Sequence, residues 1–319
     1  MLRYRTLVVF FGILALIIVS SYLLMRWTAP PARKPSLRAT EATKGNYYTV
    51  RDREGQVILE TAFPINVGDL FISEDNRVFE IFQVKEWNAL ARQTSLSVLS
   101  VENKVPRHSN ITMTAKLPLG QAVPTQAAGI HVVIYHTHSD ESYPITDGTT
   151  SIPGNGTIFE VGDHLAASLT ASGISVTHSY NTHGPHDSGA YYRSRRTAFQ
   201  LLKEGPDAAF DVHRDSAPAE AYYTLINGLA TARTMIVLGR QNPNLNTNLD
   251  FARRVKSRAD AVYPGLVRGI FIGRGNYNQD LYPTALLLEI GTDQLSRESA
   301  QRSAQHMGDV IAEVLRGRG

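Results

Sequence analysis

The sequence predicts an α/β fold: a doubly wound, mixed or parallel sheet with flanking helices, preceded by a small β domain and an N-terminal transmembrane helix. Three observations support this prediction. Strand and helix patterns alternate from Ile130 onward, short strand patterns fill residues 46–117, and an uncharged apolar run extends from Leu7 to Met25. With 319 residues, 43% of them hydrophobic, the chain can bury a core and contain more than one domain.

The run from Leu7 to Met25 carries no charge and has the length of roughly 20 residues that crosses a bilayer as a helix. A secretory signal peptide is the alternative. Its apolar region would be shorter, and no small-residue cleavage site follows here. Trp27, at the expected membrane interface, favours a retained anchor. Basic residues lie on both sides of the run, so charge counting leaves its orientation open.

The segments after the anchor differ in composition. Thr28 to Lys44 is rich in proline, alanine and basic residues, as is typical of an extended linker. Short strand patterns separated by turn residues follow, and they predict a small β domain before a second linker. The predicted organisation is a cytoplasmic tail over 1–6, an anchor over 7–25, a linker over 26–45, a β domain over 46–117, a linker over 118–129 and an α/β domain over 130–319.

In the α/β domain, runs that are typical of buried strands alternate with amphipathic helix patterns. The predicted strands are the runs HVVIYHTH, ISVTHSY, AAFDVHRD, TMIVLG, GIFIG and TALLLEIG. The predicted helices are Thr157 to Ser172, a segment that Ser188 caps and that ends at Gly205, Asn248 to Val262, and Ser296 to Leu315. This alternation favours a doubly wound sheet.

Three of these strands end in polar side chains that can bind metals or transfer protons. These side chains are His136, His138 and Glu141 after the first strand, Asp211, His213 and Asp215 on the third, and Glu289 on the last. Parallel strands that lie side by side would bring these ends into one cleft. Two histidines and one carboxylate make a three-ligand zinc site with an open position, and a further carboxylate can act as a general base.

Each group also has a structural interpretation. The pattern of His136 and His138 is common where a strand alternates and one histidine is hydrogen-bonded in the core. The run around His213 is also compatible with an ion-paired strand end. Glu289 follows three leucines directly, and a carboxylate there is costly to bury without a purpose. The pattern alone leaves both interpretations open.

The composition excludes some kinds of partner and some kinds of metal site. The net charge is only +3, from 32 Lys and Arg against 29 Asp and Glu, so nucleic acid is not an expected partner. A sequence pI near 9.0 favours mild attraction to anionic polymers such as cell wall or a membrane surface. The chain contains no cysteine, which excludes disulfides and thiolate metal sites. Any zinc must therefore be held by His, Asp or Glu.

Several runs carry a family resemblance when they are taken in order: VVIYHTHSDESY, FDVHRDS, IVLGRQNPNLNTNLDFA with YPGLVRGIF, and YNQDLYPTALLLEIGTDQLSRESAQRSA. They resemble the stage II sporulation protein P family, membrane-anchored N-acetylmuramoyl-L-alanine amidases of endospore-forming bacteria. The resemblance covers Ile130 to Leu315 and is thin outside this region. The loop from Pro144 to Gly156 carries no matching run.

The resemblance implies a zinc amidase fold and a zinc-dependent amidase, which cleaves the amide between the lactyl group of N-acetylmuramic acid and the L-alanine of the stem peptide. It implies zinc as the cofactor, with His138, Glu141 and His213 as its ligands. It also implies Glu289 as the catalytic base, which takes a proton from the attacking water and passes it to the leaving amine.

The resemblance leaves two ligand positions open. His136 is an alternative to His138, or a group that supports a ligand, and Glu160 at the start of the next helix is the rival of Glu141. Two other function classes also stay open. One is a zinc peptidase that cleaves within the stem peptide, and the other is a non-catalytic scaffold that binds the wall.

The implied substrate sets the expected location. Peptidoglycan lies outside the membrane, so we expect a single-pass protein of the cell membrane with an extracytoplasmic catalytic domain and residues 1–6 inside. In the family, the activity supports septal thinning and engulfment of the forespore. The partners that the resemblance implies are a lytic transglycosylase and other membrane-anchored sporulation proteins.

Overall fold

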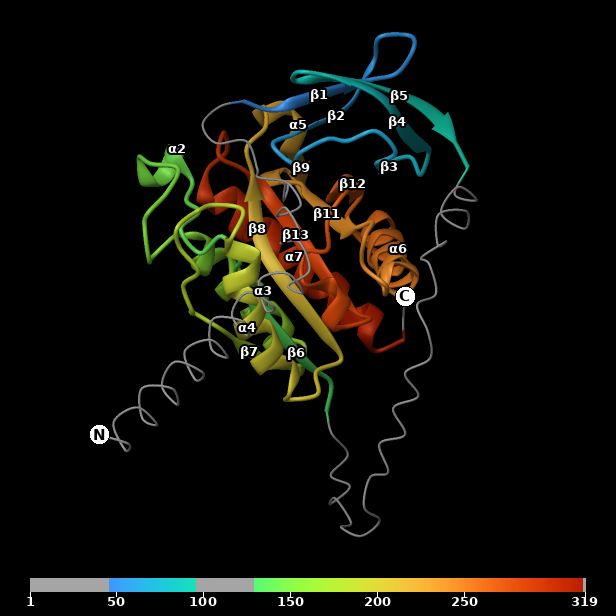
Figure 1. The fold of residues 1–319 in the computed structure, drawn as a ribbon. Helices are drawn as coiled ribbons and strands as arrows, with labels where there is room; N and C mark the ends of the chain where they lie inside the picture. Colours follow the sequence, from blue (N-terminus) through green and yellow to red (C-terminus); the bar gives the residue numbers. More distant parts are fainter. Residues whose placement is uncertain (1–45, 96–128, 318–319) are drawn as a thin grey trace, which may run out of the picture. The chain divides into compact units, whose positions relative to one another are not determined.

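The computed structural model describes residues 46–95 and 129–317, all within one compact unit that the contacts delimit as 39–319 (Figure 1). The predicted anchor, the first predicted linker, the end of the predicted β domain and all of the second predicted linker except Gly129 lie outside the described residues. Within the described ranges, no helix is both long and apolar enough to span a membrane. Membrane anchoring therefore stays a prediction.

A mixed sheet of eleven strands forms the centre of the described structure, in the order β2-β1-β5-β4-β3-β12-β11-β13-β8-β6-β7. Its strands are β1 (Tyr48–Arg51), β2 (Val57–Thr61), β3 (Leu70–Ser73), β4 (Val78–Lys85), β5 (Asn88–Thr94), β6 (His131–Tyr135), β7 (Ser175–His178), β8 (Ala208–Asp215), β11 (Thr234–Gly239), β12 (Val267–Gly273) and β13 (Ala285–Thr292). A hairpin of β9 (Tyr223–Ile226) and β10 (Leu229–Ala232) forms a second, two-stranded sheet. The predicted mixed α/β fold with a large sheet is confirmed.

Helices cover both faces of the α/β half of the sheet (Figure 1). They are α2 (Pro144–Asp147), α3 (Ile158–Ala171), α4 (Ala190–Leu202), α5 (Ala219–Tyr222), α6 (Leu245–Val262), α7 (Arg297–Leu315) and the 3₁₀ turn η2 (Gln279–Leu281). Alternate residues of β6 show the two faces, since successive strand side chains point to opposite sides. Val132 and Ile134 share a core with α3, α6 and α7, whereas Val133 and Tyr135 pack with α4.

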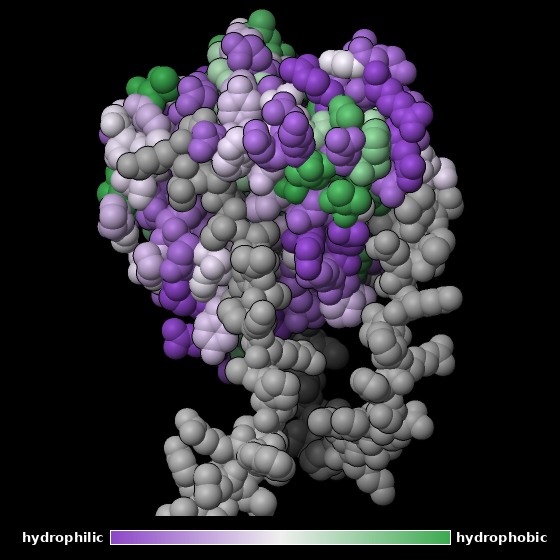
Figure 2. All heavy atoms as spheres, turned by 45° about the horizontal axis from the view of Figure 1, so that its top comes forward, coloured by the Kyte–Doolittle hydropathy of each residue, from purple (hydrophilic) through white to green (hydrophobic). Residues whose placement is uncertain are grey.

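Strands β1 to β5 continue the same sheet. β3 runs antiparallel to β12, with Ile72 opposite Ile270. Phe71 and Phe79 share an apolar core with Phe271, so the two halves bury side chains against each other. Figure 2, which turns the side carrying β1 to β5 toward the viewer, shows a largely hydrophilic surface with a compact green patch and scattered green spots. The boundaries of a separate β domain stay a prediction.

Most predicted elements are present, and the differences have local causes. β5 was not predicted, because Asn88–Thr94 is rich in polar residues and buries only one face. Ser296 caps α7, since its side chain accepts a hydrogen bond from the Ser299 backbone N–H at 3.3 Å. The predicted cap at Ser188 is wrong, because the N-cap of α4 is Gly189 and no side chain caps that helix. The β9–β10 hairpin was missed although it turns at Asn227 and Gly228, both at positive φ (52° and 77°). An Asn-Gly pair between apolar runs is a strong hairpin signal.

Strands β13, β8 and β6 are neighbours in the sheet and run parallel to one another (Figure 1). Their carboxyl ends therefore lie along one edge, as the sequence predicted. β11, on the other side of β13, runs antiparallel to it. The polar residues that end β6, β8 and β13 are thus collected at a single place, where ligand sites of open α/β sheets lie.

Candidate metal and catalytic site

His213, near the end of β8, lies between two carboxylates. Its Nδ1 is 3.6 Å from Glu141 Oε1, and its Nε2 is 2.9 Å from Asp211 Oδ1. The second contact is at an ion-pair distance. His213 and Glu141 are completely buried. Burial opposes a charged imidazole, yet the Asp211 and Glu141 carboxylates outweigh it and raise the pKa of His213 well above its ordinary value.

His138 faces His213 across the same space. The two ring centroids are 5.2 Å apart, and the rings are steeply inclined at 78°. His138 is 4% exposed, so it is almost as buried as His213. The structure therefore brings together the three residues that the family resemblance implies as zinc ligands.

The types of donor atom in this group suit a zinc ion. Glu141 Oε1 and His213 Nδ1 are buried atoms without a hydrogen-bond partner among the described residues. Buried polar atoms normally have hydrogen-bond partners. A group of buried polar atoms without partners therefore suggests that an ion binds there. Imidazole and carboxylate donors are the set that zinc prefers in the absence of cysteine. Glu141 is held in place because its Oε2 accepts a hydrogen bond from the Arg214 backbone N–H at 2.9 Å.

Glu289 lies beside this group on β13. It is in register with His213 on the neighbouring parallel strand, and it is completely buried. Its carboxylate adds to the effect of burial in raising the pKa of Tyr143 and of Tyr222. The pairing of β13 with β8 is interrupted directly after Glu289, and Gly291 takes a φ of +77° there. Such an interruption bends a strand and directs a side chain into a site.

His136 is engaged elsewhere. Its Nδ1 donates to the Val212 carbonyl at 2.8 Å, and its Nε2 lies 2.8 Å from Nε2 of His178. Burial lowers the pKa of His136 well below its ordinary value, and the neighbouring His178 adds to this. With both ring nitrogens occupied, His136 behaves as a hydrogen-bonded core histidine.

Glu160 also lies away from the two imidazoles. Its carboxylate pairs with Arg297 at 3.2 Å and accepts a hydrogen bond from Gln301 at 3.3 Å. Its side chain is 49% exposed, at the start of α3. The carboxylate beside His213 is therefore that of Glu141.

A second polar group, which was not predicted from the sequence, adjoins His138. The potential ligand atoms of His138, Asp140 and His186 lie within 4.8 Å of one another. However, the His138 and His186 rings are stacked, with centroids 3.8 Å apart and an angle of 15°. Ring nitrogens bind metals in the ring plane, so parallel rings do not direct both nitrogens to one point. The stacking argues against one ion bound by both rings, although these three are the described residues whose donor atoms lie close enough together to hold one.

Hydrogen bonds within this second group support the same conclusion. Asp140 Oδ1 lies 3.1 Å from His186 Nδ1, and its Oδ2 accepts a hydrogen bond from Ser151 at 2.5 Å. Burial raises the pKa of Asp140, but the bonds from His186 and Ser151 outweigh it and hold that pKa well below its usual range. His186 lies in a Gly-Pro loop before α4, where no periodic pattern marks a site.

Asp215 ends β8 two residues after His213 and connects it to the first strands. Its Oδ1 accepts a hydrogen bond from the Ala62 backbone N–H at 2.8 Å, and its Oδ2 accepts one from the Tyr222 hydroxyl at 2.8 Å. Burial raises the pKa of Asp215, and the bonds from Ala62, Thr61 and Tyr222 oppose this rise. The end of β2 is thus fixed to the strand that carries His213.

The family model described as stage II sporulation protein P (SpoIIP) matches residues 75–312, most of the chain. The chain belongs to this family. A relative from the same family, stage II sporulation protein P of Bacillus subtilis (strain 168), is 32% identical over 202 residues. That match covers 57% of this chain and 50% of the relative, so the chain spans about half the length of the relative it matches.

Solved structures of amidases are similar at lower identity. They are the N-acetylmuramyl-L-alanine amidase Ami1 from Mycobacterium smegmatis (16% identity, 60% of this chain and 98% of that chain, TM-score 0.39), the catalytic domain of CwlV from Bacillus (Paenibacillus) polymyxa var. colistinus (17%, 59% and 98%, 0.37) and the CwlD amidase from Clostridioides difficile in complex with the GerS lipoprotein (7%, 60% and 98%, 0.41). The family assignment rests on the sequence matches.

Proposed function

We propose that this chain is a peptidoglycan hydrolase of sporulation, and specifically a zinc-dependent N-acetylmuramoyl-L-alanine amidase. Membership of the stage II sporulation protein P family supports the sporulation role. The observation that carries the chemistry is the buried group of His138, Glu141 and His213 beside Glu289. It lies at the carboxyl ends of three neighbouring parallel strands.

His138, Glu141 and His213 would hold the zinc ion. When bound, zinc would polarise the scissile carbonyl and lower the pKa of water at its open position. Asp211 orients His213, because its contact with Nε2 leaves Nδ1 directed toward Glu141. Asp211 is itself fixed by the Thr137 backbone N–H at 2.7 Å and the Thr137 hydroxyl at 2.6 Å.

Glu289 is the general base in this proposal. It accepts the proton of the attacking water and donates it to the leaving amine, which is the usual work of a carboxylate held beside a hydrolytic site. Its complete burial supports this role, since a carboxylate is costly to bury without a purpose. The bend of β13 at Gly291 is a local reason why the Glu289 side chain is directed toward this site.

The bond that is cleaved distinguishes the amidase from a peptidase that uses the same site. The test is digestion of purified peptidoglycan by the full chain, followed by mass spectrometry of the products. We expect stem peptides that begin with a free L-alanine amino group and glycan strands that keep their lactyl groups. Cleavage between two amino acids would favour the peptidase, and absence of any cleavage would favour the wall-binding scaffold.

We further propose that residues 7–25 anchor the protein and that residues from 26 onward lie outside the membrane. The uncharged run, the adjoining Trp27 and an extracytoplasmic substrate support this arrangement. Protease added to intact protoplasts should then digest the catalytic part. Protection of that part, or recovery of a shortened soluble form, would contradict the anchor.

The proposed partners are a lytic transglycosylase and other membrane-anchored sporulation proteins. An amidase removes stem peptides and leaves the glycan strands intact, so complete removal of a septal wall needs a second enzyme for the glycan bonds. The test is crosslinking in sporulating cells followed by recovery of the tagged chain. Failure to recover any glycan-cleaving enzyme would contradict this partnership.

A further inference from the structure

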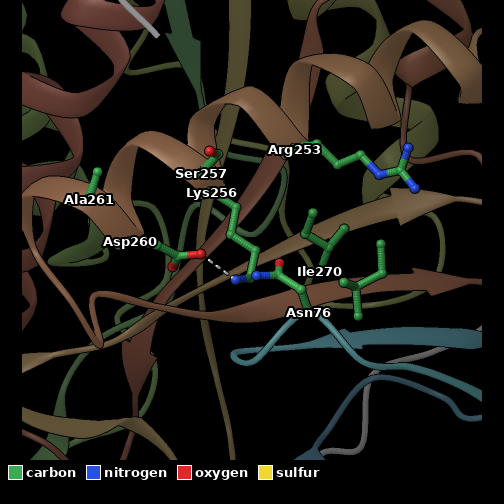
Figure 3. A pocket seen from close by; sticks show the side chains of 8 residues that line it. Asn76, Arg253, Lys256, Ser257, Asp260, Ala261 and Ile270 are labelled. Atoms are coloured by element: carbon green, nitrogen blue, oxygen red, sulfur yellow. Dashed lines mark hydrogen bonds and ion pairs between the residues drawn. The ribbon is translucent and has the colours of Figure 1, made fainter.

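A hollow of about 580 Å³ lies between the β3–β12 junction and α6, and its buried charge is already matched. Lys256 in its lining is 1% exposed, and its Nζ donates to Asp260 Oδ2 and to the Glu74 carbonyl, both at 2.7 Å. Figure 3 shows the Lys256 and Asp260 side chains meeting, while Arg253 points away from them. This hollow therefore gives no reason to expect a ligand, and the surroundings of the proposed zinc site are more informative.

The Tyr191 ring, in the first turn of α4, lies against both histidines of the proposed zinc site. Its centroid is 5.5 Å from that of His138 and 6.2 Å from that of His213, while the two histidine centroids are 5.2 Å apart. The three rings therefore stand at the corners of a nearly equilateral triangle. Tyr191 is partly exposed, whereas both histidines are buried. Of the three rings, it is thus the one that a substrate can reach from solvent.

The position of Tyr191 is fixed by the loop between β12 and β13. The side-chain amide of Asn278 donates to the Tyr191 carbonyl at 3.2 Å. The Tyr277 ring packs against the Tyr191 ring, with the centroids 5.4 Å apart. Further along α4, the guanidinium of Arg195 donates to both carboxylate oxygens of Asp280, each at 2.7 Å. The first turn of α4 is therefore held against this loop at several points.

The two loop residues that contact Tyr191 have an unusual backbone conformation. Tyr277 has a φ of 51° and Asn278 a φ of 57°, both in the left-handed region. Asparagine tolerates this region, but for a bulky side chain such as that of Tyr277 it is costly. Residues held in such conformations cluster at functional sites. This strain supports a functional reason for holding Tyr191 in its place.

The proposed hydrolysis places negative charge on the oxygen of the scissile carbonyl. When water adds, a C–O bond forms, a water proton passes to Glu289, and the π electron pair of the carbonyl moves onto its oxygen. A preorganised hydrogen-bond donor beside that oxygen stabilises the transition state. Ionised Glu141 and Glu289 can only accept hydrogen bonds, whereas a phenol hydroxyl donates one and keeps its proton at neutral pH.

We propose that Tyr191 is a further catalytic residue of this site, whose hydroxyl donates a hydrogen bond to the oxygen of the scissile carbonyl as water adds. This inference rests on the proposed amidase function. The Tyr191 hydroxyl keeps its proton throughout, and Glu289 remains the base. Removal of the hydroxyl alone leaves the three proposed zinc ligands in place, so it should affect turnover and not zinc content.

The first test compares the wild-type full chain with Tyr191→Phe, which removes the hydroxyl and keeps the ring beside the two histidines. Turnover of purified peptidoglycan should fall by about 100-fold, the scale for loss of one oxyanion donor, with KM and zinc content unchanged. Tyr192→Phe is the matched control, because this neighbouring side chain is 67% exposed, and it should keep its turnover. Normal turnover in Tyr191→Phe would overturn the inference alone, whereas an inactive wild-type chain would overturn the proposed function and this inference with it.

The second test measures binding and does not depend on turnover. The probe is an N-acetylmuramoyl-L-alanine analogue in which an anionic, tetrahedral phosphinate group replaces the scissile carbonyl. In isothermal titration, Tyr191→Phe should bind this probe about tenfold more weakly than the wild type, as expected for one hydrogen bond to a charged group. An analogue with a methylene group at the same place offers no oxygen and should bind both chains equally. Equal affinity of the phosphinate for both chains, or equal weakening of both analogues, would make Tyr191 a structural residue and overturn the inference.

Discussion

His136 and His213 are both completely buried near the carboxyl ends of neighbouring parallel strands, yet their surroundings differ. His136 contacts a carbonyl and a second imidazole, and its pKa is lowered. His213 contacts two carboxylates, and its pKa is raised. Burial alone therefore does not decide what a histidine can do. The charge of its neighbours separates a core residue from a candidate metal ligand.

The sharpest test of this difference is removal of each imidazole. His213→Ala should abolish zinc binding and all hydrolysis, because it removes one of three proposed ligands, and His138→Ala should do the same. His136→Gln is the matched control and should retain its zinc. Zinc content per chain, measured by elemental mass spectrometry, checks this. Zinc that persists in His213→Ala, or is lost in His136→Gln, would reverse the assignment of the two histidines.

The next largest effect is expected at Glu289. Glu289→Gln should reduce turnover by about 100-fold or more, the usual scale for a positioned proton-transfer group, while zinc stays bound. Amide and carboxylate are nearly isosteric, so the fold should be retained. Turnover on peptidoglycan and zinc content are measured together. Near-normal turnover would exclude Glu289 as the base, and loss of zinc would make it a ligand instead.

The raised pKa of His213 predicts a pH dependence of zinc affinity. In the metal-free chain, the protonated ring stabilises the fold below about pH 6.5, and this contribution is lost as pH rises through the raised pKa. Zinc binds only after the proton leaves, so affinity should rise about tenfold per pH unit while the ring remains protonated. The rise should continue above pH 6.5, where an ordinary imidazole has lost its proton. A plateau beginning at that pH, seen in competition with a chelator, would contradict the raised pKa.

The close packing around His136 predicts an effect on the stability of the fold without loss of zinc. A Cβ at Gly162 on α3 would lie 2.7 Å from Nε2 of both His136 and His178. Gly162→Ala should therefore destabilise the fold by about 1–3 kcal/mol, the cost of overpacking, and keep its zinc. Gly129→Ala, where an added Cβ meets nothing within 4 Å, is the control for urea unfolding. An equally stable Gly162→Ala would mean that α3 packs less closely on the histidine pair.

The smallest effect is expected at Glu160. Its contacts with Arg297 and Gln301 are half-exposed, and such pairs contribute less than about 1 kcal/mol. Glu160→Ala should keep both zinc and activity, whereas Glu141→Ala should lose both. The opposite pattern in a zinc assay would exchange the two carboxylates in the proposed ligand set.

Much of this site could be predicted because its signals are local. Glu289 follows three leucines, and His213 and His138 lie at the ends of apolar strands, so parallel neighbours had to bring them together. The separation of His136 from His138 could not be predicted, because it depends on His178 from another strand. Asp140 and His186 meet through a loop without periodicity.

The pairing of the two halves of the sheet also could not be predicted from the sequence. Apolar alternation marks β3 and β12 as strands but does not specify that they pair with each other. The short strands predicted in the first part of the chain and the alternating strands and helices predicted from Ile130 onward were therefore correct for individual described elements. Their joining into one sheet depends on contacts between residues about 200 positions apart, such as Ile72 and Ile270.

The hydrogen bond from the Ala62 backbone to Asp215 limits how this protein can be shortened. A chain that starts at Ile130 resembles a natural catalytic fragment, but it would leave Asp215 buried without its donors from Thr61 and Ala62. It would also expose the edge of β12 that β3 covers, and uncovered strand edges promote aggregation. Fragments for crystallography or enzymology should therefore begin before Tyr48, so that they contain β1 to β5 together with the strands that carry the histidines.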